Sequence, residues 1–159
     1  MSGRTRIGFG FDVHQLSEGR DFYLGGVRIE HHKGAVGHSD ADVLIHAICD
    51  ALLGAAALGD IGVHFPDTDV KYKGIDSLIL LQQVKTLLDE KGYHIGNIDS
   101  TVCLQEPKIM RYALAMKDKL GRVLGISHED ISIKATTNEK MGFIGREEGV
   151  VAYAVVTIY

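Results

Sequence analysis

Two short segments of the chain carry side chains that together could bind one metal ion. Asp12 and His14 lie two residues apart in the first segment, and Asp42 and His46 lie four apart in the second. Positions i and i+2 of a strand share a face, as do positions i and i+4 of a helix. Asp12, His14 and His46 therefore form a three-ligand set that suits Zn²⁺ with a fourth position open, which is typical of catalytic zinc sites.

A structural interpretation competes with this one. A strand-end aspartate and a surface histidine would also explain Asp12 and His14, and a single helix histidine is more often a core or surface residue. Asp42, His46 and Asp50 recur every fourth residue on an otherwise apolar helix. Burying such polar side chains unpaired is costly, which favours a function. Because carboxylates commonly hold the imidazoles that bind metals, we expect Asp42 to support a ligand histidine.

Three further segments could bind phosphate or sugar groups. Residues 134–143 combine threonines, bases and Glu139, a carboxylate suited to a hard divalent cation. Lys108 follows Pro107 at an expected helix start, where backbone N–H groups attract anions. Residues 60–69 carry aspartates that could bind sugar hydroxyls. A capped turn, a plain proline-initiated helix and an acidic surface loop are the respective structural alternatives.

These segments lie on an expected alternation of strands and helices. We expect strands at 5–13, 97–104, 130–136 and 147–158, a hairpin over 22–30, a long loop over 59–75, and helices at 40–58, 76–91 and 107–124. Ser39 and Asp76 are the expected N-caps of the first two helices. The fold class is therefore α/β (an α+β sandwich), with a mixed sheet of about four main strands, helices packed on one face and a small hairpin.

The composition bounds the class of protein. The chain has 159 residues, 45% of them apolar and 24% charged, with a net charge of −4, so a single domain over 1–159 is expected and a general nucleic-acid binder is not. The two cysteines show no CxxC spacing, which favours a reducing compartment. No signal peptide or membrane-spanning run is recognised. The remaining histidines outside the motifs are expected at the surface: His31, His32, His64, His94 and His128.

Taken together, the motifs resemble the 2-C-methyl-D-erythritol 2,4-cyclodiphosphate synthases of the non-mevalonate isoprenoid pathway. The matching segments, in order along nearly the whole chain, are residues 8–14, 38–43 with His46, 50–62, 65–69, 107–108, 134–140, and 142–143 with 145–146. Asn138 stands where many relatives have threonine, and His64 where lysine is common.

The resemblance implies a homotrimer with sheets around the three-fold axis and each active site between two subunits. It implies Zn²⁺ on Asp12, His14 and His46, and Mg²⁺ or Mn²⁺ near Glu139. The substrate would be 4-diphosphocytidyl-2-C-methyl-D-erythritol 2-phosphate. Its 2-phosphate would attack the β-phosphorus and expel CMP, so positioning and charge stabilisation would do most of the catalytic work. A bacterial cytoplasm, or a plastid stroma in a eukaryote, is the expected compartment.

The resemblance also implies roles for individual residues. His38 and Thr137 would stabilise the charge that develops in the transition state, and Asp50 would reach the ribose. Phe143 and Arg146 would lie near the three-fold axis, where family members can carry an isoprenoid diphosphate. The expected substrate-binding residues are Asp12, Val13, His14, His38, Ser39, Asp50, Asp60, Ile61, Gly62, Phe65, Pro66, Asp67, Thr68, Asp69, Leu104, Gln105, Glu106, Pro107, Lys108, Ile109, Met110, Ala135, Thr136, Thr137, Asn138, Glu139, Phe143 and Arg146.

Two other functions fit the same residues. A zinc phosphohydrolase could use the same three ligands to activate water, and would release inorganic phosphate or a linear product. A non-catalytic trimer could bind isoprenoid diphosphates without ever releasing CMP.

Overall fold

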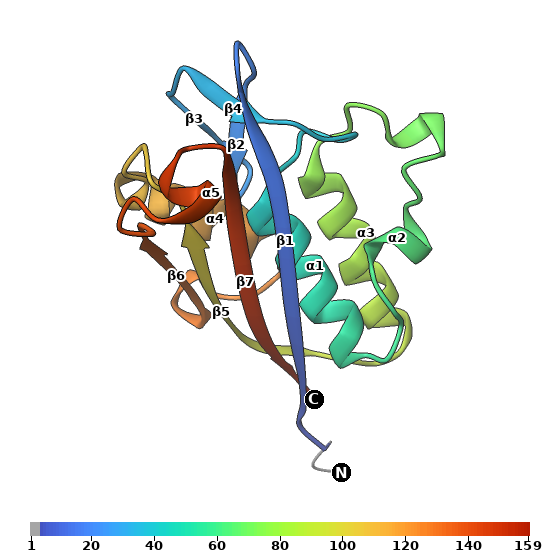
Figure 1. Cartoon of the computed structure of the whole chain (residues 1–159). Helices are drawn as coiled ribbons and strands as arrows, with labels where there is room; N and C mark the ends of the chain where they lie inside the picture. Colours follow the sequence, from blue (N-terminus) through green and yellow to red (C-terminus); the bar gives the residue numbers. More distant parts are fainter. Residues whose placement is uncertain (1–3) are drawn as a thin grey trace.

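The computed structural model describes residues 4–159 and consists of one mixed sheet with helices on one face (Figure 1). The sheet has the strand order β4-β1-β7-β5-β6, and β2 and β3 form a separate hairpin. The strands are β1 (Arg6–Glu18), β2 (Phe22–Leu24), β3 (Val27–Ile29), β4 (Lys33–Ala35), β5 (Ile95–Cys103), β6 (Ile131–Thr136) and β7 (Gly149–Ile158). The α-helices are α1 (Val43–Ala55), α2 (Ile61–His64), α3 (Ser77–Glu90), α4 (Ala113–Leu124) and α5 (Gly142–Gly145).

The topology confirms the expected fold class and adds one strand. β1 runs antiparallel to β7, β7 antiparallel to β5, and β5 parallel to β6, so the sheet is mixed. The added strand, β4, pairs with the end of β1 through Leu16, Ser17 and Glu18. Four long strands and one short edge strand therefore make the sheet.

Helix α1 packs directly against β1 at two glycines. A β-carbon built on Gly8 would overlap the carbonyl oxygen of Ala51, and one on Gly10 would overlap that of Ala47. The glycine face of β1 is thus bare because the helix backbone occupies that space. The close approach matters for the site, because Asp12 is the next residue on the same face of the strand.

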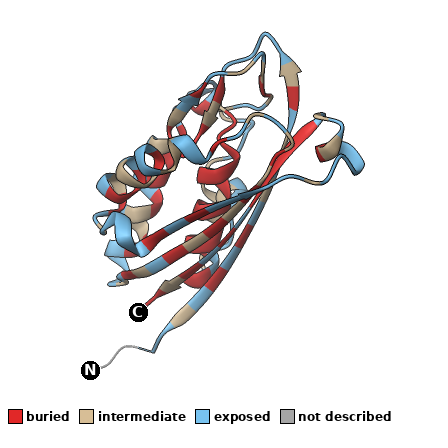
Figure 2. Cartoon of the chain, turned by 90° about the vertical axis from the view of Figure 1, so that its left-hand side faces the viewer, coloured by how far each residue is buried: buried red, intermediate tan, exposed pale blue. Residues whose placement is uncertain are grey.

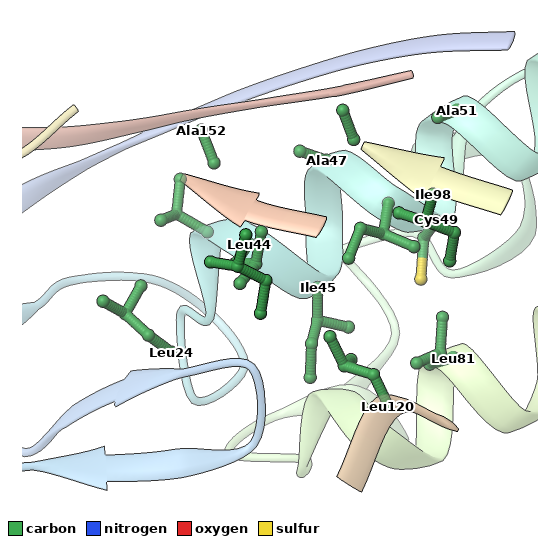
Figure 3. Packing of buried hydrophobic residues seen from close by; sticks show 14 of the residues in the cluster. Leu24, Leu44, Ile45, Ala47, Cys49, Ala51, Leu81, Ile98, Leu120 and Ala152 are labelled. Atoms are coloured by element: carbon green, nitrogen blue, oxygen red, sulfur yellow. The ribbon is translucent and has the colours of Figure 1, made fainter. Parts of the chain in front are cut away.

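The core lies between the sheet and the helices, with α1 in the middle (Figure 3). Leu44, Ile45 and Ile48 of α1 are fully buried and belong to the same core cluster as Leu81 of α3 and Leu120 of α4. Helix α1 is therefore apolar almost all round, which is typical of a buried helix.

The opposite face of the sheet is apolar and open. Along β1, Ile7 is 71% exposed and Phe9 is 62% exposed, and Tyr153 and Val155 of the neighbouring β7 are exposed as well. Figure 2 shows exposed and buried positions alternating along these strands. Contiguous exposed apolar side chains of this kind mark an interaction surface.

Two of the three expected helices have bounds that differ from the expectation, and α1 ends at Ala55 rather than at residue 58. Helix α1 begins at Val43 because Asp42, rather than Ser39, is its N-cap, with its side chain accepting a hydrogen bond from the N–H of Ile45. The helix expected from Pro107 begins at Ala113, after a short 3₁₀ turn over Met110–Tyr112. By contrast, Asp76 caps α3 as expected. No helix among residues 4–159 is both long enough and apolar enough to cross a membrane.

Candidate active site

Asp12, His14 and His46 converge on one point where the middle of β1 faces the first turn of α1. Oδ2 of Asp12 lies 2.9 Å from Nε2 of His14 and 3.1 Å from Nδ1 of His46. The two ring nitrogens are 3.2 Å apart. The structure thus brings together the three residues that spacing alone had suggested as metal ligands.

Hydrogen bonds on the far side of each ring fix which nitrogen is free. Nδ1 of His14 lies 2.9 Å from the carbonyl oxygen of Val36, which can only accept, so this nitrogen carries the proton. Nε2 of His14 is left with a lone pair that points toward Asp12 and His46.

His46 is oriented in the same way through a serine. Its Nε2 lies 2.9 Å from Oγ of Ser77 and 3.2 Å from Oγ of Ser39. The hydroxyl of Ser77 donates to Oδ1 of Asp40 at 2.5 Å, so it accepts from the Nε2–H of His46. The lone pair of Nδ1 therefore faces the cluster. The chain Asp40–Ser77–His46 is the kind of support that metal-binding imidazoles usually have.

The donor set fits a tetrahedral cation. Bonds of about 2.0–2.1 Å in a tetrahedron place neighbouring ligand atoms about 3.3–3.4 Å apart. The three separations of 2.9, 3.1 and 3.2 Å are slightly shorter, as expected for three atoms that need only a small outward movement around an ion. Three protein ligands leave the fourth position open.

The electrostatics of the cluster also favour a cation. Burial raises the pKa of Asp12, but when the imidazoles carry a proton on the side of Asp12, their hydrogen bonds and charge outweigh burial and lower that pKa to about 2. Burial lowers the pKa of His14, and the contact with Asp12 outweighs it and raises the pKa. Asp12 is consequently ionised at neutral pH, and the cluster attracts positive charge, whether a proton on an imidazole or a metal ion.

A hollow of about 540 Å³ opens directly from these three residues. His38 and Ser39 form one side of it, and the loop after α1 forms the other with Ile61, Gly62, Phe65, Pro66, Asp67 and Thr68. The hollow thereby unites many of the residues expected to bind the substrate. Tyr72, Ile75 and Leu80 also line it, and no sequence motif had indicated them.

Two aspartates hold the loop of this hollow in place. Oδ1 of Asp50 accepts a hydrogen bond from the N–H of Ile61 at 2.8 Å. Asp60 caps α2 by accepting from the N–H of Val63 at 3.1 Å. Their carboxylates thus have structural partners in addition to the sugar contacts expected of them, and those contacts stay a prediction.

A second group of expected residues lies outside this hollow, where the parallel strands β5 and β6 end. The N–H of Leu104 donates to the carbonyl oxygen of Thr136 at 3.0 Å, and the N–H of Lys140 donates to Oε1 of Gln105 at 3.0 Å. The loop over residues 104–110 therefore lies beside the loop over residues 135–140. Thr137 and Glu139 belong to this second group, and they do not line the hollow that contains His38.

The structure gives Asp42 a role other than the expected support of an imidazole. Its carboxylate accepts hydrogen bonds from the N–H groups of Gly25, Gly26 and Ile45 at 3.0, 2.8 and 3.0 Å. Burial raises the pKa of Asp42 to about 6, although these N–H groups act against the shift. Among residues 4–159, the carboxylate connected to His46 through a hydroxyl is that of Asp40. Asp42 instead joins the start of α1 to the β2–β3 turn.

Phe143 and Arg146 do not line the hollow that contains His38. Phe143 lines a second hollow of about 380 Å³ with Val13, His14, Gln15, Glu148 and Gly149, so His14 borders both hollows. Nε of Arg146 donates to Oε1 of Glu148 at 2.8 Å, so the guanidinium already has an anionic partner. Their expected proximity to a three-fold axis stays a prediction.

Sequence reasoning missed Ser77 and the functional part of Asp40. Each stands next to a residue that the sequence marks as a helix cap: Asp40 follows Ser39, and Ser77 follows Asp76. Ser77 follows the N-cap Asp76, and it is fully buried. Because the burial of Ser77 is visible only in the folded structure, the sequence carried no separate signal for its role.

Comparison with known proteins agrees with the fold and with the family that the motifs resemble. Residues 5–159 match the family model described as the YgbB family. The chain is 60% identical over 155 residues to the 2-C-methyl-D-erythritol 2,4-cyclodiphosphate synthase of Bacteroides thetaiotaomicron, covering 98% of both chains. It is 61% identical over 158 residues to the synthase of the same name from Porphyromonas gingivalis, covering 99% of this chain and 98% of that protein.

Solved structures show the same architecture. The bifunctional IspDF from Campylobacter jejuni matches with a TM-score of 0.94 and 44% identity, over 98% of this chain and 42% of that longer chain. The IspF–CDP complex of Plasmodium falciparum matches with a TM-score of 0.86 and 34% identity, over 99% of this chain and 97% of that one. The chain therefore belongs to the YgbB family, together with the 2-C-methyl-D-erythritol 2,4-cyclodiphosphate synthases that it resembles over almost its whole length.

Proposed function

We propose that the protein is a phosphorus–oxygen lyase that converts 4-diphosphocytidyl-2-C-methyl-D-erythritol 2-phosphate into 2-C-methyl-D-erythritol 2,4-cyclodiphosphate and CMP. An oxygen of the 2-phosphate attacks the β-phosphorus of the same molecule. The bond from that phosphorus to the oxygen shared with the α-phosphate breaks, and the oxygen leaves with CMP. Atoms balance without water, and the ring closes between two groups of one substrate.

The observation that carries this proposal is the three-ligand cluster at the mouth of a hollow with His38 beside it. Both reacting groups are anions, so they must be held together against their repulsion. Asp12, His14 and His46 would hold Zn²⁺, which supplies positive charge and orients phosphate oxygens when it is bound. The imidazole of His38 is exposed at the edge of the hollow and would donate a hydrogen bond to the charge that develops on the transferring phosphate.

The second group of residues would complete the site. The hydroxyl of Thr137 and the carboxylate of Glu139 lie 3.4 Å apart, at the ends of β5 and β6. Glu139 would hold Mg²⁺ or Mn²⁺ against the diphosphate, and residues 104–110 would hold the cytidine part. Thr137 and Glu139 do not line the hollow that contains His38. Each active site would therefore be shared: one chain would supply the hollow with His38, and a neighbouring chain would supply Thr137 and Glu139.

The exposed apolar face of the sheet supports the homotrimer that such sharing requires. Phe9, Phe11, Tyr153 and Val155 form a contiguous apolar surface on β1 and β7. Three copies packed through this surface would place their sheets around a three-fold axis. An isoprenoid diphosphate on that axis would have to compete with Glu148 for the guanidinium of Arg146.

The relatives also bear on the expected compartment and substrate. The curated relatives named above come from bacteria, which supports a bacterial cytoplasm as the site of action. The complex of a structural relative with CDP supports a cytidyl diphosphate as the ligand class.

The decisive experiment measures both products of the proposed reaction. The purified chain is incubated with the cytidyl diphosphate substrate, CMP release is followed, and phosphorus NMR identifies the other product before and after chelation. We expect CMP and a cyclic diphosphate in equal amounts, lost with chelator and restored by Zn²⁺ with Mg²⁺ or Mn²⁺. CMP with a linear phosphate would instead indicate a phosphohydrolase, and binding without CMP would indicate a non-catalytic trimer.

Two variants separate the roles of the proposed cation sites. His46→Ala should lower zinc content and activity together, whereas Glu139→Gln should abolish cyclisation with zinc content unchanged. Glu129→Gln, a carboxylate in the exposed 3₁₀ turn over His128–Asp130, is the matched control and should keep both properties. Normal turnover by Glu139→Gln would remove Glu139 from the proposed cation site.

A further inference from the structure

A second group of possible metal ligands lies away from the site described above. His31 and His32 stand between β3 and β4, and Glu147 stands between α5 and β7. One ligand atom from each residue lies within 4.8 Å of the corresponding atoms of the other two. The segments meet at the far end of β1, where the N–H of Gly19 donates to the carbonyl oxygen of His32. None of the three is shared with the Asp12 cluster.

The side chains of this group have no hydrogen-bond partner in the part of the chain that the structure describes. Nε2 of His31 is buried and forms no hydrogen bond with any residue of 4–159. A buried polar atom without a partner costs about 1–3 kcal/mol, so such an atom calls for an explanation. Among residues 4–159, no hydrogen bond or ion pair involves the ring of His32 or the carboxylate of Glu147. Lys33 lies close by, but its Nζ donates to the backbone carbonyl oxygen of Glu147 at 3.0 Å and leaves the carboxylate free.

The backbone of Glu147 is held in a conformation that favours glycine. Its φ is 58°, in the left-handed region, and its N–H donates to the carbonyl oxygen of Ile144 at 3.0 Å. A residue with a β-carbon costs about 1–2 kcal/mol there. The strained position keeps a carboxylate beside the two imidazoles, although a glycine would fit the turn better.

The rings themselves suit metal binding. The centroids of His31 and His32 are 4.3 Å apart. Burial, reinforced by the neighbouring His32, lowers the pKa of His31, which favours the neutral imidazole. Two imidazoles and one carboxylate form a donor set for Zn²⁺ and similar borderline cations rather than for Mg²⁺ or Ca²⁺.

We propose that His31, His32 and Glu147 form a second metal site, which binds Zn²⁺ or a similar transition-metal ion. The ion would connect the β3–β4 segment to the segment before β7, which are more than a hundred residues apart in sequence. It would give Nε2 of His31 the partner that it lacks and would offset the strain at Glu147. Its expected effect is therefore on stability, and CMP release is not expected to depend on it.

The test counts zinc ions bound by the full-length, metal-stripped chain and by variants of each site. Glu147→Gly removes one ligand and relieves the backbone, so added backbone strain does not explain a loss of binding. Glu148→Gln changes the adjacent carboxylate, which pairs with Arg146, and is the matched control. We expect about two Zn²⁺ per chain for the unchanged protein and for Glu148→Gln, about one for Glu147→Gly, and about one for His46→Ala.

A second measurement isolates the proposed site from the first. In a His46→Ala background, added Zn²⁺ should raise the melting temperature, because an ion that binds only the folded state stabilises it. Adding Glu147→Gly or His32→Ala to that background should abolish the rise. The proposal is overturned if Glu147→Gly binds as much zinc as the unchanged protein, or if zinc stabilises the His46→Ala and His46→Ala/Glu147→Gly chains equally.

Discussion

Replacing Ser77 with alanine should weaken zinc binding without touching any proposed ligand. The hydroxyl of Ser77 accepts a hydrogen bond from Nε2 of His46 at 2.9 Å and donates to Asp40 at 2.5 Å. This contact keeps the proton on Nε2 and leaves Nδ1 free for the cation. In Ser77→Ala the ring would lose its shorter hydrogen bond, and the proton could move to Nδ1.

The size of the effect follows from what remains around His46. Loss of a group that supports a metal-binding imidazole typically costs 10–100-fold in metal affinity, or about 1.4–2.7 kcal/mol. Ser39 would still lie 3.2 Å from Nε2, so the single variant should fall near the lower end, at about tenfold. The double variant Ser39→Ala/Ser77→Ala should approach about a hundredfold.

Zinc affinity is measured by competition with a chelator of known affinity, and activity is measured as CMP release at increasing zinc concentrations. Thr86→Ala is the control, because Thr86 is an exposed hydroxyl of the same helix that donates to the carbonyl oxygen of Gln82. Ser77→Ala should regain its activity at high zinc, which a merely structural defect would not allow. Unchanged zinc affinity in the double variant would refute the idea that these hydroxyls select the tautomer of His46.

Three further predictions concern the scaffold, the pH response and the assembly. Gly10→Ala should lower the free energy of unfolding by about 1–3 kcal/mol, because its β-carbon would overlap a helix carbonyl oxygen. The control Gly54→Ala places its β-carbon in open space and should not cause this loss. Equal urea midpoints for the two variants would contradict the prediction. The pKa of Asp12 is about 2 when folded and 3.8 when unfolded, so its contribution of about 2 kcal/mol should be complete above about pH 5 and should be lost as the pH falls through 2. The difference in unfolding free energy between metal-free wild type and Asp12→Asn should therefore shrink on acidification, and a constant difference would be contrary evidence. Phe9→Glu should shift the mass in solution from trimer toward monomer by light scattering, while Ile79→Glu, at an exposed apolar position on α3, should not; an unchanged mass would exclude the apolar face as the interface.

Much of the fold could be predicted because its periodic patterns are strong. The apolar positions of residues 76–91 and 107–124 follow the helical period, and the structure has α3 and α4 within these ranges. Asp76 and Gly125 mark ends that local chemistry determines, since Asp76 caps a helix and Gly125 adopts a left-handed φ of 69°.

The features that could not be predicted depend on contacts between distant segments. β4 has three residues and no periodic signal, and it exists because Gly34 and its neighbours pair with the end of β1. The support of His46 by Ser77 joins two helices that are separated by a long loop. Likewise, Asp42 rather than Ser39 caps α1, and its carboxylate also accepts hydrogen bonds from the N–H groups of Gly25 and Gly26 in the β2–β3 turn, which only the fold brings close. Local sequence therefore identified the metal-ligand residues but not the residues that orient them.

The contact of Gly8 and Gly10 with α1 fixes the position of β1 along the helix axis. Two residues of a strand span about 6.6–6.8 Å, and the four residues from Ala47 to Ala51 span about 6.0 Å of helix, so the two glycines can meet two helix carbonyls, with Gly8 at Ala51 and Gly10 at Ala47. A shift of the strand by two residues would bring the β-carbon of Arg6 or Asp12 against the helix backbone, at a place where a β-carbon overlaps a carbonyl oxygen. Asp12 comes two residues after Gly10 in the strand, and His46 comes one residue before Ala47 in the helix. The distance between the carboxylate of Asp12 and the imidazole of His46 therefore depends on Gly8 and Gly10, two residues that have no side chain.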